Sequence, residues 1–146
     1  MQTSEAGITL IAKFEGFMPT PYVCAGGHLT IGYGHVIKPH ETFDTPVTKL
    51  EARALLMADV AFAERAVLRY IHMPLSQGQF DALVSFTFNL GAGALQRSTL
   101  RRVINRGDYS SAPRQLLRWV FAGGRKLRGL VKRREAEIVL WNDLHL

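Results

Sequence analysis

A stretch without charged side chains constrains this chain more than any other feature. Residues 16–37 hold no Asp, Glu, Lys or Arg, and residues 16–46 hold five of the 13 Gly and four of the six Pro. Gly and Pro at this density interrupt helices and favour turns. Residues 29–33 alternate in a way typical of a strand, and the preceding Gly26-Gly27 pair can supply the positive φ of a hairpin turn. We therefore predict a small β-hairpin lobe.

Helical patterns lie on both sides of this segment. A short helix is predicted from near Thr3 or Ser4 to about Glu15, because Ile8 and Ile11 recur on one of its sides. After the hairpins, residues 48–51 read Thr-Lys-Leu-Glu, a capping box in which the Thr hydroxyl and the Glu carboxylate each satisfy a free amide at a helix start. It predicts one long helix.

This long helix is predicted to run to about Tyr70, with Leu55, Ala58 and Phe62 on its buried side. A second capping box at residues 76–79 opens a helix that Asn89 and Gly91 end. Further helices are predicted at residues 98–106, 112–121 and 127–144.

The predicted fold class is α+β. One domain would contain a hairpin lobe of about residues 16–46 and a larger helical lobe of residues 1–15 and 47–146. A cleft between two such lobes would suit an extended substrate.

Basic residues are concentrated in one region. The formal net charge is +6, yet residues 101–134 hold 11 Lys or Arg against one Asp. Such a region is either a set of solvated helix faces or a surface for an anionic partner. Two predicted helices meet within it at Gly123-Gly124, so a helix-turn-helix nucleic-acid-binding domain is one alternative. That alternative leaves the uncharged Gly-rich segment unexplained, and we expect no nucleic-acid partner.

The lone cysteine and the hydropathy exclude other classes. Cys24 cannot form an internal disulfide or a cysteine-based zinc cluster, and the five His are dispersed, so we expect no metal and no cofactor. No apolar run reaches the roughly 20 residues that cross a bilayer. The first run, residues 6–12, is too short for most signal peptides. We expect no transmembrane segment and synthesis in the cytoplasm.

Glu15 is the first candidate for chemistry. It stands at the end of the first predicted helix, between Phe14 and the uncharged segment that begins Gly16-Phe17. Apolar surroundings disfavour a charged carboxylate, and a general acid for glycosidic cleavage must carry a proton. Taken alone, a Glu in this place is more often an ordinary surface residue.

Three separated blocks carry a family resemblance. Glu15, Cys24 and Thr30 follow the pattern Glu, eight residues, Asp or Cys, five residues, Thr, and Thr30 is followed by Ile-Gly-Tyr-Gly-His. Residues 75–91 and 129–141 supply the other two blocks, in order. With these blocks the chain resembles the phage-type lysozymes, the endolysins of a glycoside hydrolase family.

The resemblance implies a lysozyme-like fold and hydrolysis of the β-1,4 bond between N-acetylmuramic acid and N-acetylglucosamine in peptidoglycan. It implies that Glu15 is the acid and that Cys24 and Thr30 position or activate the water. We expect His35 and Asn89 to contribute to substrate binding. The implied protein is a monomer that reaches the wall after a separate holin opens the host membrane. The basic region 101–134 would then face the anionic cell envelope.

Position 24 departs from the commoner Asp of this pattern. A thiol with an ordinary pKa of about 8.5 is only slightly ionised at neutral pH, so it is a weaker base than a carboxylate. Water positioning therefore ranks above a covalent route through the thiolate. A peptidoglycan-binding module that has lost catalysis through Cys24 is the remaining alternative. Trp119 and Trp141 could stack on sugars, but burial in the core is the expectation.

Overall fold

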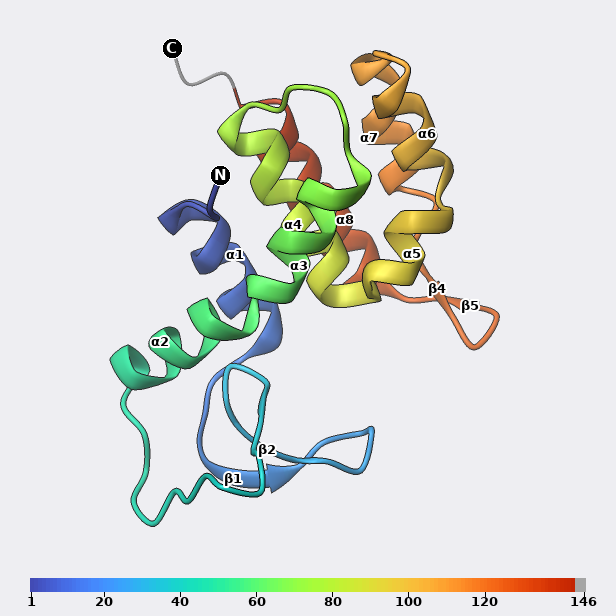
Figure 1. The fold of residues 1–146 in the computed structure, drawn as a ribbon. Helices are drawn as coiled ribbons and strands as arrows, with labels where there is room; N and C mark the ends of the chain where they lie inside the picture. The colour runs from blue at the N-terminus through green and yellow to red at the C-terminus, as the bar shows by residue number, and fades with distance from the viewer. Residues whose placement is uncertain (144–146) are drawn as a thin grey trace. The chain divides into compact units, whose positions relative to one another are not determined.

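The computed structural model describes residues 1–143, which form two compact units. One unit comprises residues 8–61, and the other comprises residues 1–7 together with the chain from residue 62 onward. Each unit has its own arrangement of helices and strands (Figure 1).

The unit of residues 8–61 contains the predicted hairpins. Helix α1 (Glu5–Glu15) leads into a three-stranded antiparallel sheet in the order β1 (Met18–Val23), β2 (Leu29–Gly32) and β3 (His35–Val36), and α2 (Lys49–Asp59) follows. The small core of this unit is formed by buried residues of the sheet, the loop and α2, with aromatic rings packed against them: Ile31, Val47, Ala52, Phe17, Tyr33 and Phe43.

The pairing of β1 with β2 is irregular. Tyr22 pairs with Thr30 in one register and Met18 pairs with Gly32 in another, so β1 carries extra residues between these pairs. Pro19 and Pro21 lie in this stretch. Pro has no backbone N–H to donate, and at a bulge the sheet does not need one from these positions. The Pro19 carbonyl accepts instead from the amide of Val47, at 2.9 Å.

The second unit is mainly helical. Its elements are α3 (Ala61–Tyr70, beginning at the unit boundary), α4 (Gln77–Leu90), α5 (Ala92–Arg97), α6 (Thr99–Asn105), a 3-10 turn (Tyr109–Ser111), α7 (Ala112–Leu116), the strands β4 (Phe121–Ala122) and β5 (Arg125–Lys126), and α8 (Arg128–Trp141). Helix α4 is the centre of this unit, because every residue from Phe80 to Thr87 is buried. Figure 1 shows α8 lying along α4. The expected burial is confirmed for Trp141, whereas Trp119 is only half-buried.

The long helix predicted from residue 48 to 70 is wrong in two respects. It consists of α2 and α3, interrupted at Val60, and its buried side holds Ala52 and Leu56, whereas Ala58 and Phe62 are exposed. The small side chain of Ala52 faces the sheet because α2 approaches β2 closely. A methyl group added at Gly32 would lie 3.0 Å from the Ala52 Cβ.

The helix predicted at residues 98–106 is confirmed as α6, but the chain before and after it differs from the prediction. Helix α5 precedes the one predicted at residues 98–106, and the one predicted at 112–121 ends at Leu116. Residues 121–126 form the β4–β5 hairpin around Gly123 and Gly124, whose φ values are +59° and +77°. Helix α8 ends at Trp141, and residue 144, the predicted end, lies outside the described residues.

Candidate active site

Glu15 lies at the last position of α1, where the helix ends at Gly16 with φ of +77°. The Glu15 side chain is half-buried and faces the turn between β2 and β3. A Cβ added to Gly34 of that turn would lie only 2.9 Å from Glu15 Oε1. The end of α1 and the β2–β3 turn are therefore in direct contact at the carboxyl group.

Cys24 and Thr30 are held together at the β1–β2 hairpin. The His28 carbonyl accepts two hydrogen bonds, one from the Cys24 amide at 2.9 Å and one from the Thr30 hydroxyl at 2.9 Å. Thr30 is buried and Cys24 is half-buried, so the pair has a fixed inner partner and an accessible outer one.

The surroundings of Cys24 favour its thiolate. The Thr30 hydroxyl has the largest effect in lowering the pKa of the Cys24 thiol, and the backbone amides of His28 and Gly26 add to it. A hydroxyl has one proton, so Thr30 donates either to the His28 carbonyl or to the thiolate. Ionisation of Cys24 and reorientation of the Thr30 hydroxyl are therefore coupled.

His35 bridges two carboxylates. It is buried, with Nδ1 at 2.7 Å from Asp59 Oδ2 and Nε2 at 2.9 Å from Glu41 Oε1. Burial alone lowers the pKa of His35, but the hydrogen bonds with Asp59 and Glu41 outweigh it, and the net pKa is raised. Since both ring nitrogens contact carboxylates, His35 links β3 to the end of α2 and to the loop between them.

Asn89 lies near the end of α4 in the helical unit. Its Oδ1 accepts a hydrogen bond from Arg134 Nη2 at 2.6 Å, and Arg134 Nη1 also donates to the Trp119 carbonyl at 3.4 Å. Arg134 is completely buried. Asn89 is thus oriented by a buried guanidinium, and Arg134 ties it to α8.

A buried ion cluster between α4 and α8 was not predicted. The fully buried Glu137 accepts from Ser85 at 2.6 Å, lies 2.8 Å from Arg134 Nε and lies 3.7 Å from Arg133 Nε. Burial raises the pKa of Glu137 to about 6, against the opposing effects of Arg134 and Ser85. The assignment of Arg133 and Arg134 to solvated helix faces is wrong, because these residues hold the two central helices together.

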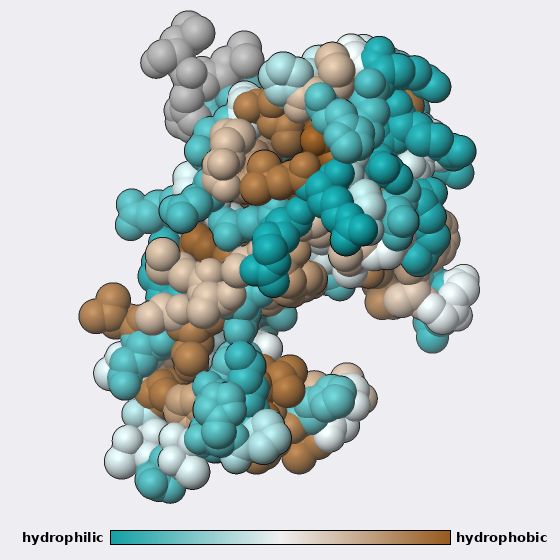
Figure 2. Space-filling view, in the orientation of Figure 1, coloured by the Kyte–Doolittle hydropathy of each residue, from teal (hydrophilic) through white to brown (hydrophobic). Residues whose placement is uncertain are grey.

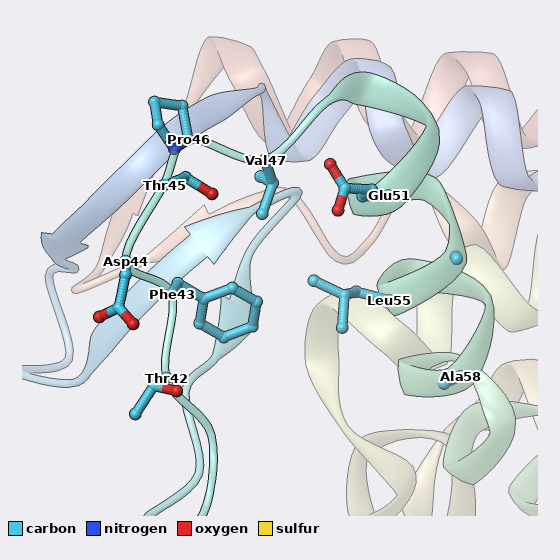
Figure 3. Close-up of a pocket in the computed structure, with 10 residues that line it drawn as sticks. Thr42, Phe43, Asp44, Thr45, Pro46, Val47, Glu51, Leu55 and Ala58 are labelled. Atoms are coloured by element: carbon cyan, nitrogen blue, oxygen red, sulfur yellow. The ribbon is translucent and has the colours of Figure 1, made fainter.

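A separate hollow lies between α2 and the loop of residues 42–47. It has a volume of about 530 Å³ and an apolar lining in which the side chains of Phe43, Val47 and Leu55 point toward one another (Figure 3). None of the five sequence-predicted site residues lines it.

Within residues 1–143, no helix combines the length and the apolar composition that spanning a bilayer requires.

Comparison with known proteins identifies the family. The phage lysozyme profile matches residues 12–137. An endolysin of Acyrthosiphon pisum secondary endosymbiont phage 1 is 38% identical over 147 residues, covering 98% of this chain and 99% of that protein. An endolysin of Bacillus phage B103 is 40% identical over 146 residues, covering 97% of this chain; the chain spans about half of that protein, 54%.

A solved structure agrees with the sequence matches. The crystal structure of a mutant of P22 lysozyme aligns with a TM-score of 0.90 at 33% identity, covering 98% of this chain and 99% of that one. The fold is therefore lysozyme-like, mixing helices with a small antiparallel sheet. The chain belongs to the phage lysozyme family, and it is a peptidoglycan-hydrolysing enzyme.

Proposed function

We propose that this enzyme hydrolyses the β-1,4 bond between N-acetylmuramic acid and N-acetylglucosamine, with Glu15 as general acid. Cleavage of this bond requires a proton on the departing oxygen, and Glu15 is the carboxyl group at the helix end beside the β2–β3 turn. The contact with Gly34 restricts the conformations of the Glu15 side chain. Restriction of this kind keeps an acid aimed at one atom of its substrate.

The observation that carries the proposal is that Cys24 and Thr30 lie together at the β1–β2 hairpin, both bonded to the His28 carbonyl. The His28 carbonyl accepts from the Thr30 hydroxyl and from the Cys24 backbone amide, and the lowered pKa of the thiol increases its thiolate fraction near neutral pH. A water molecule between these two groups would find two acceptors at fixed positions, the thiolate of Cys24 and the hydroxyl oxygen of Thr30. We assign them to orienting and deprotonating the water that attacks the sugar.

In the same reaction, His35 is assigned to positioning the turn beside Glu15, and Asn89 is assigned to substrate binding. His35 follows Gly34 directly, so its bonds to Asp59 and Glu41 hold the turn that faces Glu15. Asn89 is half-buried at the end of α4 and presents its amide nitrogen while Arg134 occupies its oxygen. That nitrogen is a donor for a sugar hydroxyl or acetamido oxygen.

The test of Glu15 uses isolated peptidoglycan and purified variants. Glu15→Gln keeps the size of the side chain and removes its acidic proton, so the rate of release of soluble fragments should fall by about 10²–10⁴-fold. Glu135→Gln, an exposed Glu on α8, is the matched control and should retain the wild-type rate. An unchanged rate for Glu15→Gln, with matching circular dichroism, would remove Glu15 from the mechanism.

The test of Cys24 distinguishes water activation from a covalent route. Cys24→Asp supplies a base that is almost fully ionised at neutral pH, so it should keep or raise the rate of hydrolysis. Cys24→Ser should lower that rate. A covalent intermediate would give product with retained anomeric configuration, and direct attack by water gives inversion. Proton NMR of the first product therefore separates the two routes.

The proposed partner of the basic region is the anionic cell envelope. Eight of its cations are exposed: Arg102, Arg106, Arg114, Arg118, Arg125, Lys126, Arg128 and Lys132. Attraction of this kind weakens with salt, over a Debye length of about 8 Å at physiological ionic strength. Binding of the inactive Glu15→Gln protein to isolated envelopes should therefore fall as salt is raised. Salt-independent binding would contradict the electrostatic assignment.

The oligomeric state of the enzyme and the way it reaches the cell wall belong to the same proposal. We propose that the enzyme is a monomer without a nucleic-acid partner. It would be made in the host cytoplasm and reach the wall when a separate holin opens the membrane. Light scattering at a mass of 16.3 kDa tests the monomer. Expression in a bacterial host with and without a holin tests the route, because only the co-expressing cells should lyse.

A further inference from the structure

The β4–β5 hairpin exposes apolar and cationic side chains together. Phe121 is 61% exposed, and Leu117 and Leu127 are 42% and 41% exposed. Every residue from Phe121 to Gly129 is exposed, so the whole ribbon stands in solvent. Figure 1 shows the hairpin extending from the helical unit beyond the ends of α5 and α8. Large exposed apolar side chains on such a ribbon and beside it are not explained by the packing of the unit.

Backbone pairing joins the two strands of the ribbon. Phe121 pairs with Lys126 and Ala122 pairs with Arg125, and the Leu127 amide donates to the Val120 carbonyl at 2.9 Å. Phe121 and Lys126 therefore share one face of the ribbon, and Leu127 lies on the other. The hairpin presents an apolar side chain on each face.

Cations surround these apolar side chains. On α7, Arg114 lies one turn before Leu117, and Arg118 follows Leu117 directly. The hairpin adds Arg125 and Lys126, and α8 begins with Arg128; all five cations are exposed. Residues 109–134 contain no Asp or Glu. Figure 2 shows hydrophobic and hydrophilic surface side by side at this end of the molecule.

We propose that this hairpin docks end-on on a bilayer of anionic phospholipid, so that Phe121 and Leu127, on its two faces, both enter the headgroup region. The five cations complement the lipid charge, and cations near an anionic leaflet each strengthen binding several-fold. A soluble anionic polymer would satisfy the cations but would leave Phe121 in water. A bilayer accepts both kinds of side chain, because its interface places apolar groups just beneath charged headgroups. The inference extends the proposed attraction to the envelope and does not depend on catalysis.

The test measures co-sedimentation of the Glu15→Gln protein with vesicles, so that wall hydrolysis plays no part. Binding should be strong to vesicles containing phosphatidylglycerol, absent from pure phosphatidylcholine, and weakened by salt. The double variant Phe121→Ser with Leu127→Ser should bind at least about tenfold more weakly. Its matched control, Leu68→Ser with Val139→Ser, changes two exposed apolar residues elsewhere in the same unit and should bind like the parent protein.

A second pair of variants tests the cations. Arg125→Gln with Lys126→Gln should weaken binding by about tenfold or more, whereas Arg65→Gln with Arg106→Gln removes the same charge outside the hairpin and should have a smaller effect. Phe121→Trp should give a blue shift of tryptophan emission on anionic vesicles. Equal binding by the hairpin and control variants, or no binding to anionic vesicles, overturns the proposal. Equal affinity of the apolar double variant and its parent would leave only electrostatic adsorption, and it overturns the proposal as well.

Discussion

The Glu15 carboxyl group lies beside Gly34, so closely that a methyl group on Gly34 would lie 2.9 Å from Oε1. Gly34 also has φ of +79°, in the left-handed region that favours glycine. Two constraints therefore coincide at one residue: the turn needs Gly for its backbone, and the carboxyl group needs the space that a missing Cβ leaves.

The first prediction separates these constraints. Gly34→Ala should displace the Glu15 carboxyl group and lower the rate on isolated peptidoglycan by about 10²-fold, since misplacement by 1 Å can cost that much. Gly124→Ala is the control, because Gly124 has φ of +77° and no atom within 4 Å of an added Cβ. It bears the same backbone strain of about 1–2 kcal/mol and should keep its activity. An equal loss of activity in Gly34→Ala and Gly124→Ala would mean that backbone strain alone causes the effect.

The second prediction concerns the thiol of Cys24. Thr30→Val removes the hydroxyl that has the largest effect in lowering the pKa of the thiol, so that pKa should rise. Alkylation by iodoacetamide, which requires the thiolate, should then shift to higher pH. Thr42→Val, at an exposed loop residue, should leave the alkylation profile unchanged. The same pH profile of alkylation in Thr30→Val and the wild type would refute the coupling between the two side chains.

The third prediction is a pH dependence of stability from His35. Its pKa is raised in the folded state from an ordinary value of 6.5, so its contribution is complete below about pH 6.5 and is lost as pH rises through the folded pKa. The free energy of unfolding should fall over this window in the wild type. His35→Gln should flatten the curve there, while His72→Gln, at an exposed residue, should not. Parallel curves for the wild type and His35→Gln would contradict the two-carboxylate bridge.

Glu41 determines how the free energy of unfolding changes at acidic pH. The Lys38 amide and then His35 lower the pKa of Glu41 from its ordinary value of 4.5. Its contribution is present above about pH 4.5 and is lost as pH falls through the lower folded pKa. The bridge should therefore contribute most between these two limits, and Glu41→Gln should remove the loss on acidification.

The fourth prediction concerns the ion cluster of the helical unit. Glu137→Ala leaves the buried guanidinium of Arg134 without its carboxylate and should lower the free energy of unfolding by about 3–5 kcal/mol. Glu135→Ala, at an exposed position of the same helix, should change it by no more than about 0.5 kcal/mol. Urea titrations at pH 7.5 measure both. A small effect of Glu137→Ala would mean that water reaches the cluster.

The elements that local chemistry specifies could be predicted from the sequence. Both capping boxes are present: the Thr48 hydroxyl accepts from the Glu51 amide at 3.0 Å, and the Ser76 hydroxyl accepts from the Gln79 amide at 3.1 Å. The turn at Gly26-Gly27 also follows from its residues. The break at Val60 has no such signal, because the flanking residues are ordinary helix formers without Gly or Pro.

Tertiary contacts account for what the sequence did not indicate. A run of Arg reads as a solvated face, and only the packing of α8 on α4 shows that Arg133 and Arg134 neutralise a buried Glu137. Gly123-Gly124 was interpreted as a break between helices, but its two positive φ values also suit a tight ribbon, and the short flanking strands carry no clear alternation. For the site, the resemblance to phage-type lysozymes predicted Glu15, Cys24 and Thr30 as a set, whereas the contact of Glu15 with Gly34 depends on the folded turn.

Digestion of isolated peptidoglycan in ¹⁸O-labelled water tests the central claim most directly. If Glu15 protonates the leaving oxygen while water attacks, mass spectrometry should find fragments with one ¹⁸O atom at a reducing N-acetylmuramic acid end, and Glu15→Gln should release almost none. Unlabelled fragments with anhydro ends, or labelled fragments released equally by Glu15→Gln, would contradict it.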